Sequence, residues 1–187
     1  NIIVISESPQ QLHQPEHSIK LLHVHDMIHY LGDKHHNTKL DALLKLCQVN
    51  EPVVTENQPE KHWWVSQQDV AACLIKLIDN VDKLPPIMNI CGRRGWTTQE
   101  TLEQLQLLYQ RTLAGVSGRF DANDLVAKPL ITPILQSGKM STKSLRPDLS
   151  VIDDVLQAVD GRRWRPLIPL RTSLMHYLAT KDLDYKV

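Results

Sequence analysis

The chain has 187 residues, of which 42% are hydrophobic and 22% charged, with 21 basic side chains against 21 acidic ones. This is the composition of an ordinary globular domain, and the balanced charge argues against a strongly basic nucleic-acid surface and against an acidic solvating tail. Because no apolar run approaches the roughly 18 to 20 residues that cross a bilayer, and no signal segment opens the sequence, we expect a soluble, cytoplasmic protein.

Cysteine and glycine usage argues against two kinds of site. The three cysteines, Cys47, Cys73 and Cys91, form no Cys-x-x-Cys pair, so we expect buried thiols rather than a disulfide framework or a thiolate zinc site. No three of the seven glycines have the spacing of a phosphate-binding loop at a helix N-terminus. The sequence therefore contains neither a dinucleotide fingerprint nor a P-loop.

The first third of the chain alternates short apolar runs with polar and amphipathic stretches. Residues 1–5 are an unbroken, β-branched run, and residues 19–24 are a second, short apolar run; both predict strands of a parallel sheet, the first of them covered on both faces. Asn37 or Thr38 can cap an amphipathic helix that follows. Residues 52–55 are a further strand candidate.

The clearest helix signal begins at Ser66. Asp69 follows three residues later, in the pattern that opens many helices, and apolar residues then recur on one face, which predicts a helix over 67–80. Two prolines interrupt the chain after it. The apolar run 87–91 then predicts another strand.

The second half is richer in predicted helices. Thr97 and Glu100 form a capping box before a long amphipathic helix that Gly115 and Gly118 stop. The remaining predictions are irregular backbone over 119–146 with a short helix near 130–136, a helix opened by Ser150 and Asp153 that ends at Gly161, and a last helix started by Pro169. Strands alternating with helices predict an α/β fold, because parallel strands need helical crossovers.

Three segments resemble a known family through their order and spacing. Residues 63–71 (WWVSQQDVA) are similar to a W/Y-V-x-V-x-D-V-A element, and residues 88–92 (MNICG), with 97–102 (TTQETL) behind them, are similar to a y-N-v-x-G strand and the helix after it. Residues 146–150 (RPDLS) resemble a closing segment. Together they resemble the extended short-chain dehydrogenase/reductases, in the NAD-dependent epimerase/dehydratase group, and most closely the dTDP-4-dehydrorhamnose reductase branch.

The resemblance implies a fold and a chemistry. The fold is α/β, with an incomplete Rossmann-like parallel sheet over residues 1–80 and a helix-rich C-terminal substrate-binding lobe over 81–187. The chemistry is hydride transfer between NAD(P) and a nucleotide sugar. The family's cofactor fold occupies an N-terminal portion that is absent here, and Glu7 stands where the family has a second hydroxyl residue. We therefore expect a truncated or catalytically degenerate relative that does not bind NAD(P) alone.

Catalysis in the family uses a Ser or Thr at a strand end and a Tyr-x-x-x-Lys pair, in which the lysine ammonium lowers the pKa of the phenol. By resemblance, Ser6 occupies the strand end, and Tyr30 with Lys34 is one Tyr-x-x-x-Lys match. These three residues are the catalytic candidates. A second match, Tyr177 with Lys181, lies near the end of the sequence, far from any expected cofactor site.

Arginines are the candidate substrate-binding residues. Arg93 and Arg94 precede a predicted helix start and could contact a phosphate of a nucleotide sugar, as could Arg146 in the closing segment. The alternative for these arginines is solvated surface charge. Residues 92–95 (GRRG) also resemble the loop by which KH domains clamp nucleic acid, an alternative against which the zero net charge counts.

Histidines gather in one part of the sequence, with seven of the nine between residues 13 and 36. His25 and His29 stand four residues apart, and such a pair can bind zinc or copper from one helical face. Since no helix is predicted there, we expect polar surface and no metal, with that pair as the alternative.

Two kinds of partner are open. A nucleotide sugar fits the family resemblance, whereas a protein partner fits a non-enzymatic interaction or regulatory subunit with the same fold. An exposed strand at residues 1–5 would favour the second, or a homo-oligomer, because unpaired strands invite pairing with another chain. Neither a membrane nor a nucleic acid is expected as partner.

Overall fold

Two compact units make up the chain. The computed structural model describes residues 2–7, 19–30, 37–49, 61–126 and 145–181. The first unit comprises residues 1–28, 62–95 and 145–170, and the second comprises residues 29–61, 96–144 and 171–187. The division at residue 80 that the resemblance implies stays a prediction.

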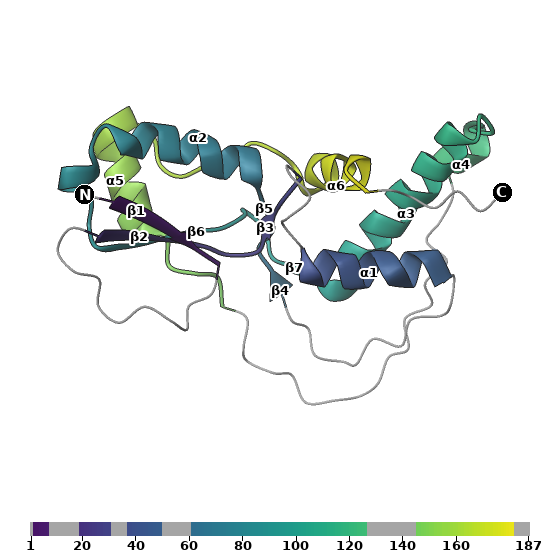
Figure 1. The fold of residues 1–187 in the computed structure, drawn as a ribbon, viewed down its shortest axis with the longest axis horizontal. Coiled ribbons are helices and arrows are strands. Elements are labelled where there is room, and N and C mark those ends of the chain that lie inside the picture. Colours follow the sequence, from purple (N-terminus) through teal and green to yellow (C-terminus); the bar gives the residue numbers. More distant parts are fainter. Residues whose placement is uncertain (1, 8–18, 31–36, 50–60, 127–144, 182–187) are drawn as a thin grey trace, which may run out of the picture. The chain divides into compact units, whose positions relative to one another are not determined.

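A parallel sheet forms the centre of the first unit. Its strands are β1 (Ile2–Ser6), β2 (Ile19–Val24) and β6 (Ile87–Ile90), in the order β1-β2-β6 (Figure 1). Both neighbouring pairs are parallel, with Val4 beside Leu21 and Leu21 beside Ile87. These strands fall within one residue of the predicted ones, and the α/β class is confirmed.

Helices cover one face of this sheet. They are α2 (Gln67–Ile78) and α5 (Ser150–Asp160), which Figure 1 shows together on the same side of the strands. Short elements complete the unit: β3 (Met27–Ile28), which pairs in parallel with β5 (Val65–Ser66), then η1 (Val81–Lys83) and the second residue of β4 (Lys61–His62). The buried core consists of Leu22, Val24, Val65, Val70, Cys73, Leu77, Leu84, Met88, Ile90, Ile152 and Leu156.

The cover over β1 is incomplete. Ile2 is 63% exposed and Ile5 is 45% exposed, whereas Leu21 and Leu22 of the neighbouring strand are buried. Successive residues of a strand point to opposite faces, so Ile2 and Ile5 lie on different faces. The expectation that the first strand is covered on both faces is therefore wrong at these two residues.

Helix starts follow the capping signals with one exception. The Ser66 hydroxyl accepts a hydrogen bond from the Gln68 amide at 3.1 Å, and α2 ends two residues before the predicted position 80. The capping box at Thr97 and Glu100 is formed in both directions. At α5 the N-cap is Leu149, not Ser150, because Ser150 is already the first helical residue.

Asp69 anchors a distant segment as well as starting a helix. Its two carboxylate oxygens accept hydrogen bonds from the Leu167 and Ile168 amides, at 2.9 and 3.1 Å. The residue is buried, and a charged acceptor that satisfies two backbone donors is among the stronger kinds of hydrogen bond. Asp69 thus fixes residues 167–168 to the first turn of α2.

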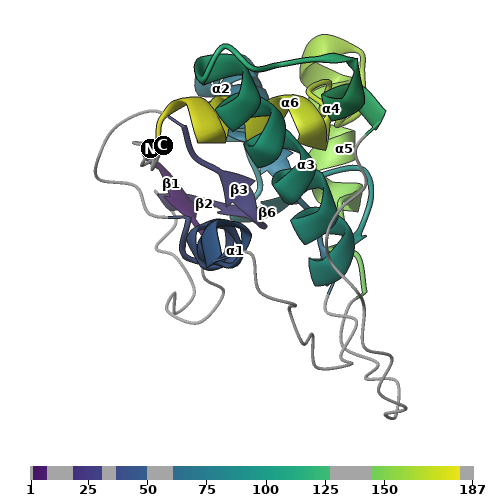
Figure 2. The ribbon, with the colours of Figure 1, turned by 90° about the vertical axis from the view of Figure 1, so that its right-hand side faces the viewer.

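The second unit is mainly helical. It contains α1 (Thr38–Val49), β7 (Trp96–Thr97), α3 (Thr98–Val116), the short α4 (Ala122–Val126) and most of α6 (Leu170–Ala179). α3 packs against both α1 and α4 (Figure 2). The strand candidate at 52–55 and the helix expected near 130–136 lie outside the described residues. No helix of the described part is long and apolar enough to cross a membrane.

A shared carboxylate joins α1 and α6 in this unit. The Tyr177 hydroxyl donates to Asp41 Oδ1 at 2.5 Å, and the Lys181 ammonium donates to the same oxygen at 2.6 Å. The Lys181 nitrogen also lies 4.8 Å from the centre of the Tyr177 ring. Burial, followed by the Asp41 carboxylate, raises the pKa of the Tyr177 phenol. This is opposite to the shift that a Tyr-x-x-x-Lys general base requires, so the second match is structural.

Gly92 lies where two chain segments touch. Its amide donates to the Trp63 carbonyl at 2.8 Å, and a Cβ atom added to Gly92 would be 2.0 Å from the Trp64 carbonyl oxygen. The atoms that this Cβ would meet belong to the backbone of Trp63 and Trp64, and backbone atoms cannot rotate away as a side chain can. Only glycine allows the segment after β6 to approach Trp63 and Trp64 this closely.

We expect Gly92→Ala to lower the free energy of unfolding by about 1–3 kcal/mol or more, because the added methyl group overpacks a site walled by backbone. Gly115→Ala is the matched control. A Cβ there meets nothing within 4 Å, and replacing this glycine in the last turn of α3 should leave stability unchanged or raise it by up to about 0.5–1 kcal/mol. Urea unfolding of both variants measures the two effects, and equal stability of Gly92→Ala and the wild type would contradict the packing argument.

The raised pKa of Tyr177 predicts a loss of stability in alkali. Since the phenol ionises near its ordinary value of 10 in the unfolded chain and above it in the folded one, its stabilising contribution is complete below that pH and declines above it. We expect the free energy of unfolding to fall above pH 10 more steeply in the wild type than in Tyr177→Phe. Urea unfolding at a series of pH values tests this, and parallel declines would show that Tyr177 is not responsible.

Candidate functional site

The carboxyl ends of the parallel strands lie at one edge of the sheet. β1 ends at Ser6, β2 continues into His25 and Asp26, and β6 continues into Cys91. The His25 amide donates to the Ile90 carbonyl at 2.9 Å, so the segments beyond β2 and β6 stay together. Ligands of open α/β sheets bind outside this edge, which makes it the candidate site.

Asp26 organises the loop at this edge. It has a φ of 51°, in the left-handed region that aspartate tolerates better than most residues. Its carboxylate accepts from the Trp63 amide at 2.8 Å and lies 3.6 Å from His62 Nδ1. Its carbonyl accepts from the Val65 amide at 3.1 Å. The turn after β2 is thereby bound to residues 62–65 by side chain and backbone together.

Arg146 lies beside the same loop. Its guanidinium carbon is 5.6 Å from the centre of the Trp63 ring, within the range of a cation–π contact. The Cys91 thiol donates to the Gly92 carbonyl at 3.4 Å. Burial raises the pKa of Cys91, and Arg146 offsets part of the rise, so Cys91 is a neutral thiol here and not a nucleophile. Arg146 thus lies against Trp63 at the edge, while the residue as a whole stays exposed.

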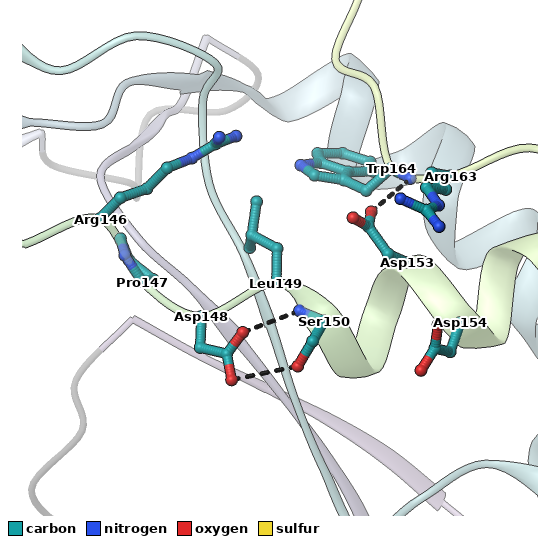
Figure 3. Close-up of a pocket in the computed structure, with 9 residues that line it drawn as sticks. All are labelled: Arg146, Pro147, Asp148, Leu149, Ser150, Asp153, Asp154, Arg163 and Trp164. Carbon is teal, nitrogen blue, oxygen red and sulfur yellow. Dashed lines mark hydrogen bonds between the residues drawn. The ribbon is translucent and has the colours of Figure 1, made fainter.

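An open pocket of about 610 Å³ adjoins this arginine. Figure 3 shows Arg146 on one side of Leu149, and Trp164 and Arg163 on the other. The remaining lining residues are Pro147, Asp148, Ser150, Asp153 and Asp154. Two arginines, three aspartates, a serine hydroxyl and an indole ring offer donors, acceptors and an apolar surface, which suits a polar ligand with hydroxyl and anionic groups.

Trp164 connects this pocket to the sheet. Its ring nitrogen donates to the Cys91 carbonyl at 2.8 Å, and its amide donates to Asp153 Oδ1 at 2.9 Å. At the other end of the pocket, the Ser150 amide and hydroxyl donate to Asp148 and lower the pKa of that carboxyl. The pocket wall is therefore tied to the residue that follows β6.

The sequence-predicted catalytic residues are placed as follows. Ser6 lies at the carboxyl edge in the first unit and is half-buried. Tyr30 belongs to the second unit, where its buried ring meets His176 edge-on with 4.9 Å between ring centres. Lys34 lies outside the described residues. The structure thus supplies no geometry that joins the three, and their catalytic role stays a prediction.

The predicted arginines are all exposed in the first unit. Arg93 and Arg94 form a bend directly after β6, and Arg146 lines the pocket. The loop over 92–95 lies between the strands β6 and β7 along the chain, whereas the KH clamp joins two helices, so the structure does not favour the nucleic-acid alternative.

The sequence gives Asp26 no role in a site, and for Arg163 and Trp164 it favours a packed tryptophan with solvated arginines over contacts to a diphosphate and a ring. Asp26 carries no motif, and its role depends on a backbone angle. Arg163 and Trp164 belong to a basic cluster with an aromatic residue, a signal that does mark the pocket wall but is equally typical of a packed tryptophan between solvated arginines.

No metal site is found in the part of the chain that the structure describes, where no three His, Cys, Asp or Glu side chains are grouped to hold an ion. His25 Nε2 lies 3.3 Å from Asn89 Oδ1. His29 belongs to the other unit, and its backbone amide and carbonyl are both hydrogen-bonded to the Asn37 side chain.

No family model and no curated protein matches the sequence. Solved structures do share the fold. One is UDP-glucuronic acid 4-epimerase from Bacillus cereus in complex with UDP-glucuronic acid and NAD, 12% identical over 87% of this chain and 45% of that chain, with a TM-score of 0.52. A tyrosine-to-phenylalanine mutant of it, with a fluorinated UDP-glucuronic acid and NAD, gives the same identity and coverages and a TM-score of 0.54. RMD from Pseudomonas aeruginosa complexed with NADPH is 14% identical over 87% of this chain and 47% of that chain, with a TM-score of 0.50.

The chain spans a little under half the length of these structures. At such low identity the likeness concerns the fold alone. It confirms the Rossmann-like α/β fold with a parallel sheet that the sequence predicts, whereas the dTDP-4-dehydrorhamnose reductase branch stays a prediction. The fold of this chain is that of a part of NAD- or NADPH-complexed α/β enzymes.

Proposed function

We propose that this chain binds a nucleotide sugar at the carboxyl edge of its sheet, and that it is related to the NAD(P)-dependent epimerase, dehydratase and reductase enzymes. The observation that carries the proposal is the pocket between Arg146 and Trp164, which is tied to the end of β6. Support comes from the shared fold, since one structure with that fold holds UDP-glucuronic acid and NAD.

Arg146 is the residue we assign to the anionic part of the ligand. A diphosphate presents paired oxygens, which the planar guanidinium group can bind with two parallel hydrogen bonds. Arg146 is held beside Trp63 and remains exposed toward the pocket. Arg163 lines the other side, and Asp148 and Asp154 offer carboxylate acceptors for sugar hydroxyl groups.

We further propose that this chain does not transfer hydride by itself. A nicotinamide dinucleotide needs close backbone approach at its pyrophosphate, which glycine-rich turns provide, and the seven glycines of this sequence have no such spacing. Of the catalytic candidates that the structure describes, Ser6 lies at the carboxyl edge. In this proposal the chain contributes sugar-nucleotide binding, and hydride chemistry depends on polypeptide beyond it.

Titration calorimetry with UDP-glucuronic acid tests the binding proposal. We expect the 187-residue chain to bind it, and Arg146→Ala to weaken binding by about 10- to 100-fold, as for the loss of a charged hydrogen-bonding partner. Arg165→Ala is the matched control, because Arg165 is equally exposed and does not line the pocket. If the two variants lose affinity equally, Arg146 contributes only its positive charge and makes no specific contact. A wild type that binds neither UDP nor UDP-glucuronic acid would refute the proposal.

The cofactor proposal has a separate measurement. Nicotinamide fluorescence rises when NADH or NADPH enters a dry protein pocket, and we expect no rise with this chain, with or without UDP-glucuronic acid. Saturable enhancement by either dinucleotide would contradict the glycine argument while leaving the sugar-nucleotide site intact.

A further inference from the structure

The ring nitrogen of Trp63 is a buried donor that has no hydrogen-bond acceptor in the described part of the chain. Burying a donor without an acceptor is costly, so such a group in a folded protein needs an explanation. Trp164 shows the ordinary arrangement, because its ring nitrogen donates to the Cys91 carbonyl at 2.8 Å. Trp63 has a donor left over at the carboxyl edge of the sheet.

A second buried ring nitrogen without a partner, among the residues that the structure describes, is His176 Nδ1 in the second unit. A histidine nitrogen can be left without its proton, and it then has nothing to donate. The indole nitrogen of tryptophan always carries its hydrogen and is a donor only. The unsatisfied group of Trp63 therefore requires an acceptor from elsewhere.

The backbone of Trp63 is fixed from both sides. Its amide donates to the Asp26 carboxylate at 2.8 Å, and its carbonyl accepts from the Gly92 amide at 2.8 Å. Asp26 is itself bonded to the next segment, since its carbonyl accepts from the Val65 amide at 3.1 Å. The spare donor thus belongs to a residue whose main chain is held at the edge.

Arg146 lies over the ring of this same tryptophan. Its guanidinium carbon is 5.6 Å from the centre of the Trp63 ring, and Arg146 is exposed and lines the pocket. An anion that binds the guanidinium therefore also comes close to the indole. Phosphate and carboxylate oxygens are acceptors, which is what the indole lacks.

We propose that Trp63 is a second ligand-binding residue of this site, and that its indole N–H donates to the same anionic group that Arg146 binds. The inference rests on the proposed function and narrows its ligand to one that carries a diphosphate. A diphosphate has enough oxygens for both residues, because the guanidinium takes two of them and another accepts from the indole. A cation or a purely apolar ligand would leave the N–H unsatisfied.

The proposal requires one movement. The Trp63 ring nitrogen is shielded from solvent in the ligand-free protein, so a phosphate oxygen needs a path to it. We expect Arg146 to turn toward the ligand and open that path, because its long side chain is exposed while the Trp63 backbone is fixed. Binding then replaces an unsatisfied donor by a hydrogen bond to a charged acceptor.

Nuclear magnetic resonance of the indole N–H groups tests the hydrogen bond directly, with UDP as the probe. The chain has four tryptophans, so four indole signals are expected. We expect the Trp63 signal to move downfield and to saturate as UDP is added, because its proton gains a charged acceptor. Trp96 belongs to the second unit, and its signal should stay in place.

Calorimetry with UDP tests the same contact through affinity. Trp63→Phe removes the N–H and keeps an aromatic ring beside Arg146, and we expect it to weaken binding about 10-fold. Trp96→Phe is the matched control, because Trp96 is also half-buried, and it should bind as the wild type does. In the Arg146→Ala background the effect of Trp63→Phe should shrink, since both residues act on one anionic group.

Circular dichroism verifies that each variant is folded. If Trp63→Phe is not folded, the wild-type spectrum decides, with the Trp63 signal assigned by elimination from variants of the other three tryptophans.

The outcomes separate this inference from the proposed function. If UDP binds through Arg146 while the Trp63 signal stays in place, Trp63 is not part of the site, and the sugar-nucleotide proposal stands. A loss of affinity in Trp63→Phe without movement of the signal would also overturn the inference, because the residue would then act through packing alone. If the wild type does not bind UDP at all, the proposed function fails and this inference fails with it.

Discussion

Trp164 lines the pocket and joins it to the sheet through two hydrogen bonds. Its ring nitrogen is bonded to the carbonyl of Cys91, the residue directly after β6, and its amide is bonded to Asp153 of α5. Both bonds are part-buried, so losing either would cost part of the desolvation of the groups it joins. The position of the pocket relative to the sheet therefore depends on the Trp164 side chain.

Asp69 performs a related task from the other side. Because it accepts from the amides of residues 167 and 168, it holds the chain that leaves Trp164 against the start of α2. Asp26 binds residues 62–65 to the end of β2 in the same way. Three polar anchors thus attach loops to an apolar core, and the pocket lies where those loops meet.

The elements that the sequence predicts well are those whose signals are local. Short apolar runs locate β1 and β2, and the hydrogen bonds at Ser66 and at Thr97 with Glu100 are formed as their spacing predicts. α5 begins at Ser150 as predicted, although the Ser150 amide is bound by the Asp148 side chain.

The candidate site is harder to predict, because it depends on contacts between residues far apart in the sequence. Arg146 meets Trp63 across 83 positions, and no local pattern encodes that meeting. The left-handed backbone of Asp26 is likewise a property of the folded loop, although aspartate is one of the residue types that permits it. Motif order identified the fold and made Arg146 a candidate, while the structure shows that Arg146 and Trp164 line one pocket.

The bond between Tyr177 and Asp41 bears on how short motifs are used to infer chemistry. A tyrosine four positions before a lysine satisfies a spacing rule, and in this chain it does so with the two side chains in contact. Yet the Tyr177 hydroxyl donates its proton to the Asp41 carboxylate, which also accepts from the Lys181 ammonium group. Whether such a tyrosine can act as a general base or only holds two helices together thus depends on the charge of a further residue, here Asp41. The Tyr-x-x-x-Lys spacing contains no information about that residue.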